Sequence, residues 1–102
     1  MHESDAKALT DEERLPVERA FYLIQQDVAE FGSALHAYDR GYVEAADRIE
    51  EQATASIRQT FDATPILREL LPKLWARLAG GQNIADSGYD ILDEIARAKQ
   101  RL

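Results

Sequence analysis

One histidine and two carboxylates form the pattern in this sequence that comes nearest to a metal site. His36 and Asp39 are three residues apart, and Glu30 lies nearly two helical turns before them. Carboxylate–histidine pairs bind iron or zinc in helical bundles, but the di-metal sites need Glu-x-x-His pairs on two helices. The chain has no such pair. We therefore interpret His36 as a solvated histidine and expect no metal and no other cofactor.

The nucleophilic side chains lack the partners that would activate them. The sequence has no cysteine, which excludes disulfides, zinc–thiolate sites and thiol catalysis. Ser33, Ser56 and Ser87 have no histidine at a spacing typical of a catalytic triad. Neither a Gly-x-Ser-x-Gly elbow nor a phosphate-binding glycine loop occurs. We therefore expect no catalytic residues, and the sequence favours a protein that is not an enzyme.

The carboxylates suit binding better than catalysis. The chain has 19 acidic and 12 basic residues, which gives a formal net charge of −7, and no Lys or Arg occurs from Ala20 to Asp39. Five carboxylates are predicted to form an acidic surface that faces a basic partner: Asp27, Glu30, Glu44, Asp47 and Glu51. Such a surface would steer a cationic protein toward it. The alternative is that these residues form solvated helix faces.

The negative charge also limits the classes of partner. An acidic chain repels phosphate backbones and anionic lipid headgroups, so we expect no direct nucleic-acid binding and no membrane binding. Residues 1–15 are polar and acidic, unlike a signal peptide, and the apolar runs are too short to span a bilayer. These features predict a cytoplasmic protein.

A long amphipathic helix must position most of these side chains. Its apolar residues recur at alternating spacings of four and three: Val17, Phe21, Ile24, Val28, Phe31, Leu35, Tyr38 and Tyr42. This spacing is typical of a helix seam that another helix covers, with a period near that of a coiled coil. Six of these residues are predicted to form a self-association seam between two copies: Phe21, Ile24, Val28, Phe31, Leu35 and Tyr38.

The boundaries of the first helix follow from proline and glycine. Because proline is tolerated near a helix start, Pro16 predicts that the helix begins at residue 15 or 16. Thr10 and Glu13 just before it have the spacing of a capping box. The helix should continue to about residue 40. Gly41 then favours a hairpin to a second helix over residues 42–61, and one helix continuous through the glycine is the alternative.

The rest of the chain predicts further helices. Residues 62–65 indicate a stop and a restart, with Thr64 as the N-cap of the next helix. This third segment, residues 66–78, is the most apolar, and Pro72 predicts a kink or a split after Leu71. A last helix from about residue 86 to the end repeats the alternating spacing.

These elements predict an all-α protein, an antiparallel bundle of three to four helices with a long first helix, completed by homodimerisation. Residues 1–9 are predicted to form a flexible N-terminal arm, and residues 10–102 a single helical domain. The function that fits best is a small acidic, non-enzymatic protein that acts through protein–protein interaction as a regulator, adaptor or assembly subunit.

Two other functions stay open. The first is an inhibitor or immunity-type protein that engages a basic partner or a nucleic-acid enzyme through its acidic face. The second is a helical ligand-binding protein or small enzyme with a pocket between its helices, near Phe31, Tyr38 and Trp75.

Overall fold

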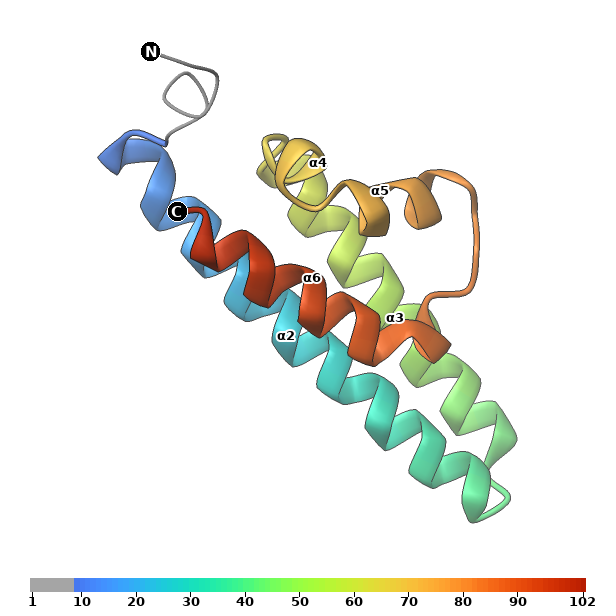
Figure 1. The fold of residues 1–102 in the computed structure, drawn as a ribbon. Helices are drawn as coiled ribbons and strands as arrows, with labels where there is room; N and C mark the ends of the chain where they lie inside the picture. Colours follow the sequence, from blue (N-terminus) through green and yellow to red (C-terminus); the bar gives the residue numbers. More distant parts are fainter. Residues whose placement is uncertain (1–8) are drawn as a thin grey trace.

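The computed structural model describes residues 9–102, which contain five α-helices, one short 3-10 helix and no strand (Figure 1). The elements are α2 (Asp11–Asp39), α3 (Val43–Ala63), α4 (Leu67–Leu70), α5 (Pro72–Ala79), η1 (Ala85–Ser87) and α6 (Gly88–Gln100). The predicted all-α class with a long first helix is therefore confirmed. The predicted arm falls mostly on residues 1–8, outside the described residues. Leu9 is described, and it is buried against the core.

A glycine turn folds α2 and α3 into an antiparallel hairpin. Gly41 has a φ of +87°, in the left-handed region that favours glycine. Its N–H donates to the carbonyl of Tyr38 (2.9 Å), and the N–H of Tyr42 donates to the carbonyl of Ala37 (2.8 Å). These two bonds satisfy carbonyls at the end of α2 in the Schellman pattern. The predicted hairpin is confirmed, and the continuous helix is not formed.

Helix α2 begins at Asp11, earlier than predicted. The Glu13 N–H donates to the Thr10 hydroxyl (3.2 Å), and the Thr10 N–H donates to the Glu13 carboxylate (3.1 Å). This capping box was predicted, but a start at residue 15 or 16 was wrong. The reciprocal cap stabilises the turn that precedes Pro16, whereas Pro16 removes only one backbone hydrogen bond close to the helix end.

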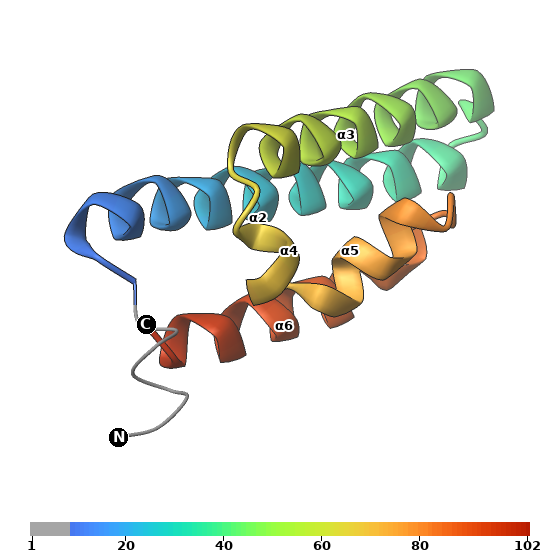
Figure 2. The same cartoon turned by 90° about the horizontal axis from the view of Figure 1, so that it is seen from above.

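The helices form two layers, with α2 and α3 in one and α4, α5 and α6 in the other (Figure 2). Large buried side chains from every α-helix fill the space between them: Phe21, Ile24, Ile57, Phe61, Leu67, Leu74, Leu78, Ile91 and Ile95. Helix α6 runs antiparallel to α2, so the end of the chain lies beside the start of α2 (Figure 1). No other described helix covers the outer face of the α2/α3 layer (Figure 2).

The third segment is split as predicted, since α4 ends before Leu71 and α5 begins at Pro72. The start of α4 differs from the prediction. Ile66 occupies the N-cap position, and Thr64 makes no side-chain cap. Instead, the backbone carbonyl of Thr64 accepts a hydrogen bond from the N–H of Leu67 (3.0 Å), because residues 65 and 66 form a turn before the helix.

Trp75 fixes this segment onto the hairpin. Its ring stacks on the ring of Phe61 in α3, with centroids 5.7 Å apart. The guanidinium of Arg68 lies 4.4 Å from the Trp75 ring centroid. The indole is therefore held between an aromatic ring and a cation, which anchors α4 and α5 to the end of α3.

Candidate interaction surfaces

The structure places the predicted self-association seam in two environments. Phe21, Ile24, Val28 and Phe31 are buried within this chain, Tyr38 is half-buried, and Leu35 is 62 % exposed. In place of Leu35, the neighbouring Ala34 is fully buried. The seam therefore serves mainly as this chain's own core, and a second copy has access to only part of it.

The predicted acidic surface is divided. Glu30, Glu44, Asp47 and Glu51 are exposed, and Asp27 is half-buried. Asp27 faces Ser56 between α2 and α3. Asp47 instead accepts a hydrogen bond from the Tyr38 hydroxyl. Tyr38, which contacts Asp47, lies eleven residues beyond Asp27, about 16 Å along the helix. Asp47 is therefore far from Asp27, and the structure does not gather the five carboxylates into one patch.

Asp27 is the carboxylate near the middle of the hairpin. Burial raises its pKa above the usual range, a hydrogen bond from Ser56 opposes the rise, and the charge of Glu30 adds to it. Its Oδ2 atom is buried and has no hydrogen-bond partner within residues 9–102. Asp27 is thus an incompletely satisfied acid at the side of the molecule that no other described helix covers.

A second group of acids lies near the hairpin turn. The hydrogen bond to Asp47, helped by burial and by the charges of Asp47 and Glu50, raises the pKa of Tyr38 to about 12. Burial, together with the charges of Asp47 and Asp86, raises the pKa of Glu50, and a hydrogen bond with Tyr38 opposes the rise. The carboxylates of α3 and η1 therefore create a negative field at this end of the molecule.

One groove runs along the outer face of the hairpin, and we call it the α2/α3 groove. It has a volume of about 470 Å³ and is lined by Leu15, Pro16, Arg19, Ala20, Leu23, Ser56, Gln59, Thr60, Ala63 and Thr64. Leu15 and Leu23 are 64 % and 42 % exposed. Of the described residues that line it, none is a carboxylate and only Arg19 is charged.

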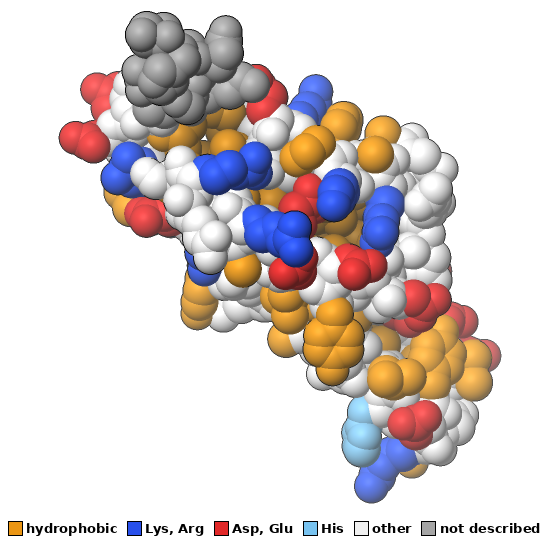
Figure 3. All heavy atoms as spheres, in the orientation of Figure 1, with side chains coloured by type: hydrophobic (Ala, Val, Ile, Leu, Met, Phe, Trp, Pro, Cys, Tyr) orange, Lys and Arg blue, Asp and Glu red, His pale blue; other side chains and the backbone are white. Residues whose placement is uncertain are grey.

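A second groove lies between α2 and the start of α6, and we call it the α2/α6 groove. Its volume is about 430 Å³, and its lining includes Val28, Phe31, Gly32, Leu35, Glu50, Asp86, Tyr89 and Leu92. Tyr89 is 91 % exposed and Leu92 is 37 % exposed. Hydrophobic side chains gather near the start of α6 with acidic side chains beside them, whereas Lys and Arg gather mainly over α5 and the rest of α6 (Figure 3).

The exposed residues of both grooves were missed at the sequence level, except Leu35. Leu15, Leu23, Tyr89 and Leu92 lie off the predicted seams, so the four–three spacing did not identify them. The one feature of the sequence that could have identified them is a large apolar side chain outside the seam of an amphipathic helix. Such residues are common singly on surfaces, and only the fold shows that these form grooves.

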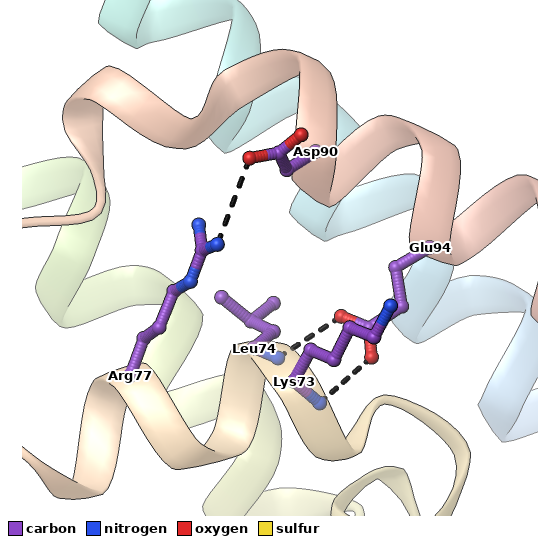
Figure 4. A network of polar contacts seen from close by, with 5 residues as sticks. All are labelled: Lys73, Leu74, Arg77, Asp90 and Glu94. Atoms are coloured by element: carbon purple, nitrogen blue, oxygen red, sulfur yellow. Dashed lines mark hydrogen bonds and ion pairs between the residues drawn. The ribbon is translucent and has the colours of Figure 1, made fainter.

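Polar contacts join the start of α5 to the middle of α6 (Figure 4). Leu71, at the N-cap position of α5, has no side-chain oxygen with which to cap the helix. The carboxylate of Glu94 in α6 instead accepts hydrogen bonds from the N–H groups of Lys73 (2.8 Å) and Leu74 (2.9 Å). A carboxylate is also favoured at the positive end of a helix dipole. This role of Glu94 was not predicted from the sequence. The one signal for it was the start of a helix at Leu71, a residue that cannot cap the helix.

A cleft of about 810 Å³ separates α5 from α6. Arg77 forms an ion pair with Asp90 (3.6 Å), and Arg97 forms one with Asp93 (3.1 Å). Arg101 donates a hydrogen bond to the carbonyl of Leu70 (3.2 Å). Since three of the four cations that line the cleft already have a partner, we interpret the cleft as part of the packing of α6 and not as an anion site.

The remaining sequence-level candidate is His36, which is exposed near the end of α2, as is Asp39. In residues 9–102 no group of three acidic or histidine side chains is arranged to hold a metal ion. None of the described helices has the length and apolar character needed to cross a membrane. In comparisons with known proteins, no family model, no curated protein and no solved structure matches this chain.

Proposed function

We propose that this chain is a non-enzymatic protein-interaction protein, an adaptor or assembly subunit, whose helices form an antiparallel bundle that a second copy completes at the α2/α3 groove. The observation that carries the proposal is the groove itself. Two exposed leucines, Leu15 and Leu23, flank it, and it contains one arginine and no carboxylate among the described lining residues. In a chain of net charge −7, such a surface lets two copies approach with little repulsion.

The outer face of the hairpin is large enough for such an interface. Helix α3 has 21 residues, so the whole outer face of the hairpin is about 30 Å long and, for two helices, about 20 Å wide. The groove, which reaches from residue 56 to residue 64 of α3, takes up about 12 Å of that length. The whole face is of the order of 600 Å², close to the roughly 800 Å² per partner of a standard interface. Small residues of α2 and α3, among them Ala20, Ser56 and Ala63, leave room for leucines of the second copy.

Two charges of α2 fit a two-fold pairing at this face. Arg19 and Asp27 lie four residues before and four residues after Leu23. If two α2 helices pack antiparallel with Leu23 at the two-fold axis, each Arg19 faces the partner's Asp27. The pairing would place the cation of one copy beside the half-buried Asp27 of the other.

The test measures molar mass by sedimentation equilibrium for the wild type and two variants. We expect a dimer for the wild type and a monomer for Leu23→Asp, because that variant places two carboxylates at the axis. Leu35→Asp is the matched control, a leucine in the other groove, and it should stay dimeric. A monomeric wild type, or a dimer that survives Leu23→Asp, contradicts the proposed dimer.

The register can be tested separately by charge reversal. Arg19→Asp alone should weaken the dimer because it places like charges opposite each other, and adding Asp27→Arg should restore it. If the double variant is no tighter than Arg19→Asp, the two helices do not pair with Leu23 at the axis.

A further inference from the structure

The α2/α6 groove differs from the dimer surface in what its walls carry. Its floor is apolar, formed by Val28 and Phe31, and Leu35 and Tyr89 are well exposed at its sides. Apolar side chains grouped in this way mark a surface that another molecule covers. Helix α6 does not cover it, because the helix begins at Gly88, opposite Val28, and runs away from Leu35.

Gly32 gives the groove an open floor. It lies in the interior of α2, where glycine is less favourable than alanine by about 1 kcal/mol. A Cβ atom added at Gly32 would meet no atom within 4 Å, so the chain's own packing does not require glycine there. What the missing side chain provides is close access to the α2 backbone from outside, in the wall of the groove.

The charges at the groove select the chemistry of its occupant. Glu50 and Asp86 line it, and no Lys or Arg is found among its described lining residues. Burial raises the pKa of Glu50, and the negative charges of Asp47 and Asp86 add to the rise. A second copy of this acidic chain would add to the repulsion, whereas a cationic segment would relieve it.

The length of the groove suits a short helix. Its α2 side extends from Gln25 to Leu35, eleven residues or about 15 Å along the axis. Apolar anchors at positions i, i+4 and i+7 of a bound helix span about 10 Å, as in helix-in-groove recognition. We propose that the α2/α6 groove binds a basic amphipathic helix of a partner protein, with its apolar side chains in the groove and its Lys or Arg side chains beside Glu50 and Asp86.

This inference rests on the proposed function, since it names the partner of a protein that acts by binding others. The test uses the full chain and two synthetic helices with the same leucine face. One carries lysine at all positions outside the leucine face (the Lys peptide), and the other carries glutamate at those positions (the Glu peptide). Fluorescence anisotropy of the labelled peptides should show binding of the Lys peptide that weakens as salt is raised. The Glu peptide should bind at least about tenfold more weakly.

Variants then locate the binding site. Leu35→Ala and Tyr89→Ala remove exposed side chains without opening the core, and each should weaken Lys-peptide binding by about tenfold or more. Glu50→Gln should weaken it and reduce its salt dependence. Leu15→Ala, in the α2/α3 groove, is the matched control and should leave peptide affinity unchanged.

Three outcomes would overturn the inference. The first is equal affinity for the Lys and Glu peptides, and the second is Lys-peptide binding that Leu35→Ala and Tyr89→Ala leave unchanged. The third is loss of the dimer in Leu35→Asp but not in Leu23→Asp, which would make a second copy the occupant of this groove. The first two outcomes leave the dimer at the α2/α3 groove standing, because molar mass and peptide affinity are measured separately, whereas the third overturns both the dimer and the peptide site. A monomeric wild type that still binds the Lys peptide would overturn the dimer alone.

Discussion

The two grooves of this protein are similar in volume and opposite in charge. The α2/α3 groove, about 470 Å³, contains Arg19 and no carboxylate among its described lining residues. The α2/α6 groove, about 430 Å³, contains Glu50 and Asp86 and no described cation. Both expose leucine side chains, so apolar exposure alone does not distinguish them. The charges beside the leucines do, and they favour a second copy at one groove and a basic partner at the other.

The grooves also differ in how the fold builds them. The α2/α3 groove lies between helices that are consecutive in the sequence and joined by the turn at Gly41. The α2/α6 groove needs helices that are far apart in the chain, and α6 is held in part through Glu94. The second groove is therefore the more sensitive to changes in the α4–α6 layer.

The largest effect is expected from a core residue of α2, the helix that both grooves share. Phe21 is fully buried between the layers, so Phe21→Ala should lower the free energy of unfolding by about 3–5 kcal/mol. Tyr22→Ala, at an exposed neighbouring position, should change it by less than about 0.5 kcal/mol. Urea unfolding monitored by circular dichroism measures both. Equal effects of the two variants would show that the layers do not meet at Phe21.

A smaller effect on stability is expected from Glu94→Ala, a change that should affect the α2/α6 groove and not the α2/α3 groove. Glu94→Ala removes the acceptor for two N–H groups at the start of α5, which should cost about 2 kcal/mol. Hydrogen exchange should accelerate at the amides of Lys73 and Leu74, and Lys-peptide affinity should fall. Asp93→Ala, which breaks only an exposed ion pair, is the control and should change stability by about 0.5 kcal/mol or less.

The molar mass of Glu94→Ala tests whether the two grooves are independent. Because the α2/α3 groove contains no residue of α5 or α6, the variant should remain a dimer. Loss of the dimer together with loss of peptide binding would mean that the two grooves are not independent.

The smallest effect is expected on the pKa of Tyr38, which contacts Asp47 near the α2/α6 groove. The pKa of Tyr38 is raised to about 12, first by its hydrogen bond to Asp47. The folded chain therefore keeps the Tyr38 proton at pH values where the unfolded chain loses it. The stabilising contribution is complete below about pH 10 and is lost as the pH rises through about 12.

Absorbance titration of tyrosinate measures this effect. Asp47→Asn should lower the pKa of Tyr38 toward its usual value near 10, because it removes the charged acceptor. Thr54→Ala on the same helix is a control without a carboxylate. An unchanged tyrosinate titration in Asp47→Asn would show that Asp47 does not set the field beside this groove.

Much of the fold could be predicted from the sequence because its signals are local. The four–three spacing identified the buried face of α2 from Val17 to Phe31, and glycine at position 41 identified the hairpin. The same spacing failed at Leu35. Periodicity shows which face of a helix is apolar, but it does not show where the covering helix stops. Here α6 begins opposite Val28, so Leu35 stays exposed.

The candidate surfaces were harder to predict because they join distant segments. Tyr89 and Leu35 are more than fifty residues apart in the sequence, and no local pattern places them in one groove. The acidic residues show the same limit. Asp27 and Asp47 look equivalent in the sequence, but the hairpin puts Asp27 against Ser56 and Asp47 against Tyr38. Their neighbours, and not their residue type, decide what each can bind.

If both proposals hold, the two grooves bind different partners at the same time. The most direct measurement is the mass of the wild-type chain with saturating Lys peptide, by native mass spectrometry or sedimentation equilibrium. We predict a complex of two chains and two peptides, because each chain uses the α2/α3 groove for its copy and the α2/α6 groove for a peptide. A complex of one chain and one peptide, formed as the dimer dissociates, would contradict the claim and show that both partners compete for one surface.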